Sequence, residues 1–177
     1  MTHQIYQTEG VVLKKKDFGE ADCFFCIFTE KFGMIKAVAK SARLEKSKLR
    51  GGLDLFSFVN LALIFSKDFW KIVDARETGR TGKSNADYFV KIKIFAELAN
   101  FLVRMIKGEE KNDFIWREIK NFLSAVYDKS VTKEEIKKLG VQTTARILNN
   151  LGYMKDVPVI KHQVISAINK AIKESML

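Results

Sequence analysis

The chain has 177 residues, of which 47% are apolar and 29% charged, a composition that excludes a disordered chain. No apolar run approaches the ~20 residues of a membrane-spanning helix, and the polar residues 1–4 predict no secretion signal. Two cysteines are too few for a disulfide framework, so a reducing cytoplasm is expected. The net charge of +10 favours a polyanionic partner such as nucleic acid.

Five short segments with β-type patterns occupy the first 80 residues. The third alternates, with Ile35, Ala37 and Ala39 on one face and Lys36 and Lys40 on the other. Five strands in about 80 residues predict a small barrel or sandwich, and a five-stranded Greek-key barrel of the OB type fits this count and length as a first domain, residues 1–80. The five segments are residues 10–16, 21–29, 34–40, 56–65 and 69–77.

After residue 83 the apolar pattern has a helical period. Ser84 with Asp87 and Thr132 with Glu135 resemble capping boxes, and Gly108 is a plausible helix stop. Four helices are predicted for a second, all-α domain, residues 81–177, which makes the chain an α+β protein. Their apolar positions are Tyr88, Ile92, Phe95, Ala99, Leu102 and Ile106; Ile115, Ile119, Phe122 and Val126; Ile136, Leu139, Ile147, Leu148 and Leu151; Val164, Ile165, Ile168 and Ile172.

The segment Gly79–Ser84 (GRTGKS) ends in the G-K-S of a phosphate-binding loop. The full pattern needs a glycine five residues before Gly82, where Glu77 stands. No alternating β-α-β pattern surrounds the segment either. A glycine-rich turn between domains, with Ser84 as a helix cap, is therefore the better interpretation.

The two cysteines, Cys23 and Cys26, form a C-x-x-C inside an aromatic β segment. A spacing of three along a strand points the sulfurs to opposite faces, and a zinc site needs further ligands. His3 and His162, the two histidines, lie in separate segments. Two buried apolar thiols are predicted, without metal or cofactor.

No nucleophile motif such as G-x-S-x-G occurs, so the sequence does not indicate an enzyme.

The densest positive charge lies in residues 31–50, which hold seven Lys and Arg side chains against one acid. Lysines 14–16 add a second patch. If residues 41–50 are helical, Arg43, Lys46 and Arg50 share one side; if they form a loop, the charges spread along a phosphate backbone. Basic grooves with aromatic platforms are typical of single-stranded nucleic-acid binding, because every base has a face to stack on. The surrounding aromatic residues, most of them expected in the core, are Phe18, Phe24, Phe25, Phe28, Phe32, Phe56 and Phe58. The alternative for the charge run is a solvated face.

Three motifs occur in order within this part of the chain. Residues 18–22 (FGEAD) form a GE-x-D turn, residues 29–34 (TEKFGM) a T-x-x-x-G hairpin, and residues 39–53 (AKSARLEKSKLRGGL) a basic connection. Together they resemble the bacterial RecO family of recombination mediators, over about residues 8–77. Beyond them the resemblance is in architecture only. Ser41 stands where the family often has glycine. No cysteine follows Cys26, so the four-cysteine zinc module of many members is expected to be absent or stripped of metal.

The resemblance implies a bacterial cytoplasmic DNA-repair protein that is not an enzyme in the turnover sense. Such proteins bind single- and double-stranded DNA, anneal complementary strands, bind the tail of single-strand-binding protein and, with RecR, help load RecA onto coated DNA. The residues predicted to bind nucleic acid are Lys14, Lys15, Lys36, Lys40, Arg43, Lys46, Lys48 and Arg50. In the helical domain, Arg104 and Arg146 are predicted to bind the partner peptide. The alternative is an OB-fold adaptor for an acidic peptide or protein, because acidic peptides attract the same cations as DNA.

Overall fold

The computed structural model describes residues 4–49, 51–66, 69–78, 86–154 and 161–174. The chain divides into two compact units. One unit holds residues 1–82 together with residues 106–112, and the other holds the remaining residues. The Gly79–Ser84 motif and the predicted helix start at Ser84 lie outside the described residues.

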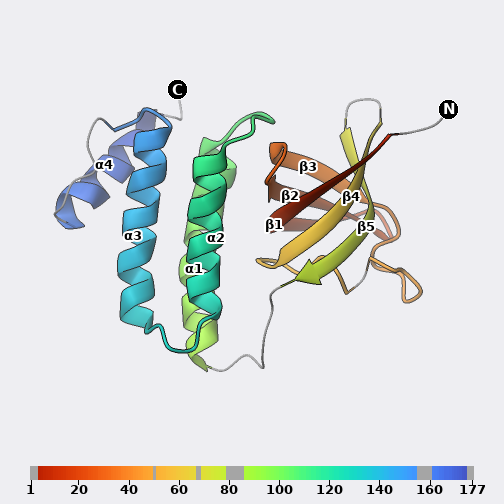
Figure 1. Ribbon diagram of the computed structural model, residues 1–177, viewed down its shortest axis with the longest axis horizontal. Helices are drawn as coiled ribbons and strands as arrows, with labels where there is room; N and C mark the ends of the chain where they lie inside the picture. The colour runs from red at the N-terminus through yellow and green to blue at the C-terminus, as the bar shows by residue number, and fades with distance from the viewer. Residues whose placement is uncertain (1–3, 50, 67–68, 79–85, 155–160, 175–177) are drawn as a thin grey trace. The chain divides into compact units, whose positions relative to one another are not determined.

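The first unit is a closed barrel of five strands (Figure 1). They are β1 (Ile5–Phe18), β2 (Asp22–Thr29), β3 (Gly33–Ala39), β4 (Phe58–Ser66) and β5 (Phe69–Thr78). Around the barrel the order is β1-β2-β3-β5-β4, and only the β3–β5 pair is parallel. The predicted five-stranded barrel of the OB type is therefore confirmed.

Strand β1 is longer than predicted because it pairs with two neighbours. Residues 5–11 pair with β4 and residues 10–18 pair with β2. Gly10 belongs to both pairings, and a Cβ there would lie 2.8 Å from Cγ2 of Ile27. The missing side chain lets β1 cross closely over β2 at the point where its partner changes.

Side chains from all five strands fill the barrel interior. The third strand alternates as predicted, with Ile35, Ala37 and Ala39 buried and Lys36 exposed. The buried cluster also contains Val12, Cys23, Phe25, Ile27, Val59, Leu61, Leu63, Trp70, Ile72 and Ala75. The inward positions of the strands are thus used for the core.

Residues 106–112 pack with the barrel although they connect two helices. The Nε1–H of Trp70 donates a 2.8 Å hydrogen bond to Oε2 of Glu109. Gly33, at φ 65°, lies against the backbone of Glu110 and leaves no room for a Cβ. The glycine of the T-x-x-x-G hairpin therefore serves both the tight turn and this close packing.

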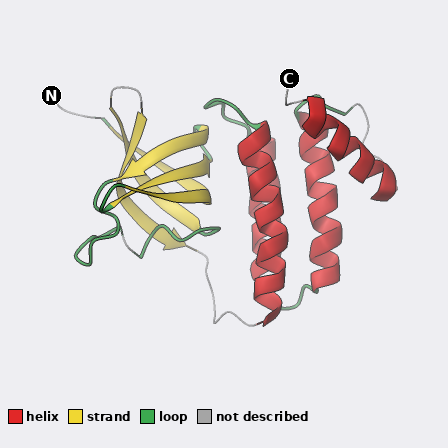
Figure 2. Cartoon of the chain, turned by 180° about the vertical axis from the view of Figure 1, so that it is seen from behind, coloured by secondary structure: helices red, strands yellow, loops and turns green. Residues whose placement is uncertain are grey.

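The second unit contains the helices α1 (Ala86–Met105), α2 (Asp113–Tyr127), α3 (Lys133–Asn150) and α4 (Lys161–Glu174), drawn in red in Figure 2. The predicted capping box at the start of α3 is present. The backbone N–H of Glu135 donates to the Thr132 hydroxyl, and the Glu135 carboxylate accepts from the Thr132 N–H.

The apolar faces of the helices mostly follow the predicted period. The whole predicted face of α2 is buried, namely Ile115, Ile119, Phe122 and Val126. On α4, Val164 is buried, but Ile165 is 43% exposed, so its assignment to the apolar face is wrong. Among the described residues, no helix is long and apolar enough to cross a membrane. A barrel followed by an all-α unit confirms the α+β class.

Candidate nucleic-acid interface

Cationic side chains line the outer face of β1, β2 and β3. Successive side chains of a strand point to opposite faces, and directly paired residues share a face. The register pairs Lys14 with Cys26 and Cys26 with Lys36, so one row carries a lysine on each side of Cys26. In the next row, Lys16 pairs with Phe24. All three lysines are exposed, and the face presents their charge to solvent.

An exposed aromatic pair lies on the same face. Phe24 is 38% exposed and Phe18 is 55% exposed. Their rings meet edge to face with centroids 4.7 Å apart. The neighbouring Phe25 points into the barrel core and is buried, whereas Phe28, although buried, lies on the same side of β2 as Phe24. The aromatic segment of β2 thus contributes Phe25 to the core and Phe24 to the basic face.

The connection between β3 and β4 carries the second group of cations. Residues 40–49 form turns without a helix, so the loop alternative is confirmed for them, and Arg50 lies outside the described residues. Three buried side chains anchor the connection to the barrel: Ala42, Leu49 and Leu53. The lysines among the described residues of the connection are Lys40, Lys46 and Lys48, and all three are exposed.

Arg43 is bound to the turn between β1 and β2. Its Nη1 lies 3.1 Å from Oδ2 of Asp17, and its guanidinium also donates to the carbonyl of Glu20. Its backbone N–H donates to the carbonyl of Ala21 at 3.0 Å. Arg43 therefore fixes the connection to the GE-x-D turn before any ligand is bound.

The last residue of the GE-x-D turn makes a second tie to the connection. Oδ1 of Asp22 accepts a 2.7 Å hydrogen bond from the backbone N–H of Ser41. Ser41 has φ 54°, a left-handed conformation that favours glycine. The carboxylate stabilises this backbone at the position where the family often has glycine. Two of the three sequence motifs therefore form one bonded structure.

The predicted nucleic-acid residues fall into separate places. Lys14 and Lys36 lie on the outer face of β1–β3, and the connection lysines follow β3. Lys15 lies on the other side of β1, with its Nζ 5.7 Å from the ring centroid of Phe25. Lys31, part of the counted charge cluster, lies on the β2–β3 turn.

Sequence reasoning missed two residues of the basic face as site residues. The charge count includes Lys16 only as part of a lysine run, and Phe24 is one of seven aromatic residues of which most are expected in the core. The available signal is strand alternation, which puts residues 14, 16 and 18 on one face and residue 15 on the other.

The two cysteines lie on opposite faces of β2, as their spacing predicts. Cys23 is buried, and its thiol donates to Oδ1 of Asp17 at 3.4 Å. Burial and this hydrogen bond raise the pKa of Cys23. Cys26 is only half-buried, so the prediction of a buried thiol is wrong there. Within the described part of the chain, no three His, Cys, Asp or Glu side chains are grouped to hold a metal ion.

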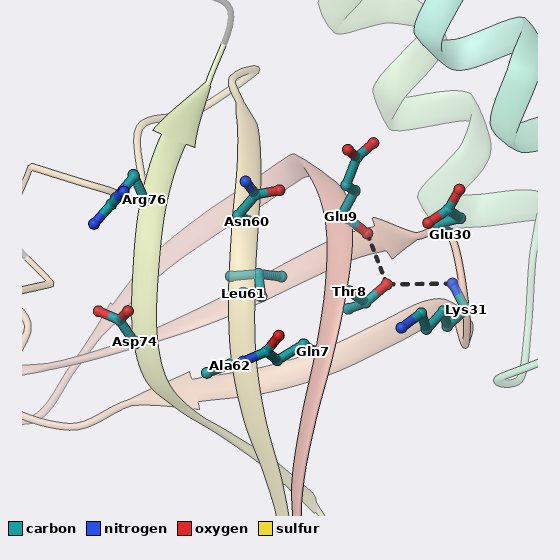
Figure 3. A pocket seen from close by; sticks show the side chains of 10 residues that line it. All are labelled: Gln7, Thr8, Glu9, Glu30, Lys31, Asn60, Leu61, Ala62, Asp74 and Arg76. Atoms are coloured by element: carbon teal, nitrogen blue, oxygen red, sulfur yellow. Dashed lines mark hydrogen bonds between the residues drawn. The ribbon is translucent and has the colours of Figure 1, made fainter.

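A polar hollow of about 400 Å³ lies on another side of the barrel, across β1, β4 and β5 (Figure 3). Ala62, which lines it, has a short side chain between its paired neighbours Gln7 and Asp74 and so leaves space between them. The charged side chains around it are Glu9, Glu30, Lys31, Asp74 and Arg76. Three carboxylates against two cations make this hollow less suited to a polyanion than the basic face.

An apolar groove of about 470 Å³ lies between α1 and α3, with a contribution from α4. Neither predicted peptide-binding arginine lines it. Arg104 is exposed near the end of α1, and Nη2 of Arg146 lies 2.7 Å from Oε2 of Glu118 on α2. The lining residues are Ile94, Glu97, Leu98, Phe101, Lys137, Gly140, Val141, Thr144 and Ile168. Lys137 is the cation of this groove.

The closed barrel, its basic outer face and the helical unit define an OB-fold protein with an attached helical domain. Comparison with known proteins identifies a family of similar proteins within this class. Residues 1–69 match the family described as Recombination protein O N terminal. This match confirms the resemblance to RecO that the three motifs indicate.

Curated relatives extend the similarity beyond the barrel. DNA repair protein RecO of Synechocystis sp. is 42% identical over 73 residues, 41% of this chain and 27% of the relative. DNA repair protein RecO of Thermodesulfovibrio yellowstonii is 29% identical over 154 residues, 85% of this chain and 59% of the relative. The RecO of Caldanaerobacter subterraneus is 26% identical over 148 residues, 84% and 58% of the two chains. The chain thus spans less than two thirds of each of these relatives.

Proposed function

We propose that this chain is a DNA repair and recombination mediator that works by binding DNA, without turning over a substrate. The observation that carries the proposal is the outer face of β1–β3, where Lys16 pairs with Phe24 and Lys14 and Lys36 flank the next row. The similarity to proteins named DNA repair protein RecO over 85% of the chain supports it. Phosphate contacts position a strand without reading its sequence, so such a face acts on any DNA.

Strand annealing follows from the same electrostatics. Two complementary strands repel each other, and a cationic surface that binds both lowers the repulsion and raises their local concentration. Counterion release drives this binding. The basic face continues along the chain from Lys36 into the lysines of the connection, Lys40, Lys46 and Lys48. A basic surface of this length can contact the phosphates of more than one DNA strand, whether the DNA is single-stranded or double-stranded.

The groove between α1 and α3 is where we place the acidic, apolar tail of single-strand-binding protein. Leu98, Phe101 and Val141 would accept an apolar anchor, and Lys137 would pair with a carboxylate. Glu97 would repel the same carboxylate and so restrict the direction of the peptide. Interaction with RecR and the loading of RecA are proposed from the family resemblance alone.

The test is the rate at which the protein anneals two complementary oligonucleotides of random sequence. The variant Lys14→Glu with Lys36→Glu reverses the charge of the basic face. A matched control, Lys31→Glu with Arg76→Glu, makes the same change of net charge at the polar hollow. The proposal expects annealing by the parent and the control, and a rate lower by about tenfold or more for the first variant.

Two results decide between the candidate functions. Equal annealing by both folded double variants would show that the basic face is a solvated surface. A parent that binds an acidic peptide but neither binds nor anneals DNA would make the chain an OB-fold adaptor. Circular dichroism establishes that both variants keep the parent fold before their rates are compared.

A further inference from the structure

Phosphate binding does not explain why the aromatic side chains of Phe18 and Phe24 are exposed on the basic face. Lysines alone attract a phosphate backbone, whether it is single or paired. A large aromatic ring exposed to water contributes nothing to that attraction. The neighbouring ring of Phe25 on the same strand is buried, so exposure is not general for the aromatic residues of β2. The position of Phe24 within the basic face therefore indicates a contact with another part of DNA.

The sheet holds the ring of Phe24 in a fixed place. Phe24 is the third residue of β2 and is paired with Lys16 of β1 and Val38 of β3. The edge-to-face contact with Phe18, at 4.7 Å between centroids, supports it from the end of β1. A base stacked on this ring would have Lys16 beside it and the Lys14–Lys36 row two residues along, within reach of its flanking phosphates.

We propose that Phe24, supported by Phe18, stacks on an unpaired base and gives the basic face a preference for single-stranded over double-stranded DNA. The inference rests on the proposed function, since it assigns a role within the same DNA-binding face. In a duplex both faces of each base are already stacked on neighbours, so the ring finds no free base surface. In a single strand the bases are free to unstack and lie on the ring.

The experiment compares the affinity of the full chain for a labelled oligonucleotide and for its duplex. Phe24→Ala should weaken single-strand binding about 5- to 150-fold, the range measured for losing one stacked base. Its duplex affinity should change less than about twofold, because the lysines remain. Phe24→Leu keeps an apolar side chain in the strand and should show the same selective loss, while Phe24→Trp should restore single-strand binding.

A matched control separates stacking from general loss of exposed aromatic surface. Phe65 is 47% exposed on β4, where its ring contacts Trp70, and Phe65→Ala should leave both affinities unchanged. Equal losses of single-strand and duplex affinity in Phe24→Leu, or no loss, would overturn the proposal. A parent chain that binds neither form of DNA would instead contradict the proposed function.

Discussion

Arg43 and Asp17 lie 26 positions apart in the chain, and their side chains meet as an ion pair, Nη1 to Oδ2 at 3.1 Å. Asp17 is near the end of β1, and Arg43 is in the connection between β3 and β4. The pair, together with the bond from Arg43 to the Glu20 carbonyl, holds the connection against the barrel. The lysines of the connection are thereby presented from an ordered loop.

Asp17→Ala should loosen this connection without unfolding the barrel. The pair is partly exposed, with side chains 38% and 61% accessible, and such pairs contribute about 0.2–1 kcal/mol. We therefore expect trypsin to cleave within residues 40–49 about 1.5- to 5-fold faster, as measured by limited proteolysis. Asp74→Ala removes an exposed carboxylate from β5 and should leave the rate unchanged. Identical rates for all three proteins would show that the pair does not hold the connection.

Lys91→Met should destabilise the helical unit. Lys91 is 3% exposed, and its Nζ donates a 2.8 Å hydrogen bond to the carbonyl of Asp128 after α2. Its charge also acts on the carboxylates of Asp128 and Glu135. Removing the donor breaks a hydrogen bond made by a charged group, and such bonds contribute about 1.5–3 kcal/mol. Urea denaturation followed by helical circular dichroism measures the loss, and the exposed Lys93→Met should change stability by less than about 0.5 kcal/mol.

The capping box of α3 should make helical stability depend on acid pH. Hydrogen bonds from the Thr132 N–H and hydroxyl to the Glu135 carboxylate lower its pKa. A carboxyl with a lowered folded pKa stabilises the fold above its ordinary value and loses that effect as pH falls through the lowered one. Stability should therefore decline below about pH 4.5, and Glu135→Gln should decline less. A parent and variant that differ by the same amount at pH 7 and at a pH well below 4 would contradict this.

The cysteines offer a chemical footprint of the interface. Cys26 lies half-buried between Lys14 and Lys36, whereas Cys23 is buried and its raised pKa keeps it protonated. A maleimide should therefore label Cys26 first, and bound single-stranded DNA should slow that labelling several-fold. Mass spectrometry after brief labelling reads both sites. Labelling of Cys26 at the same rate with and without saturating DNA would place the DNA elsewhere.

Local pattern predicted much of the fold. The period of α2 and the capping pair Thr132–Glu135 are read directly from sequence, because each depends on residues within a few positions. The beginning of β1 was not predicted, since Gln7 and Glu9 are polar and point outward, and their β4 partners lie far along the chain. The burial of Lys91 was missed for the same reason, because its partner Asp128 is 37 positions away.

The charge of the site could be predicted, but its arrangement could not. Counting found the basic segment, yet Lys31 and Lys36 from that segment lie on different sides of the barrel. The strand pairings that close the barrel determine on which side each lysine lies, and these pairings cannot be derived from the amino-acid composition. The sequence predicts that Arg43 contacts DNA, and in the structure its guanidinium forms an ion pair with Asp17. Its direct contact with DNA stays a prediction.

The most direct test of the central claim is the salt dependence of single-stranded DNA binding, measured by fluorescence anisotropy on the parent and the two double variants. If ~3–5 phosphates are neutralised, log K should fall against log[salt] with a slope of about −2 to −3.5. Lys14→Glu with Lys36→Glu should flatten the slope by about 1.4, because two phosphate contacts are lost. Lys31→Glu with Arg76→Glu should keep the parent slope. Equal slopes for the two folded variants would contradict the assignment of DNA binding to the outer face of β1–β3.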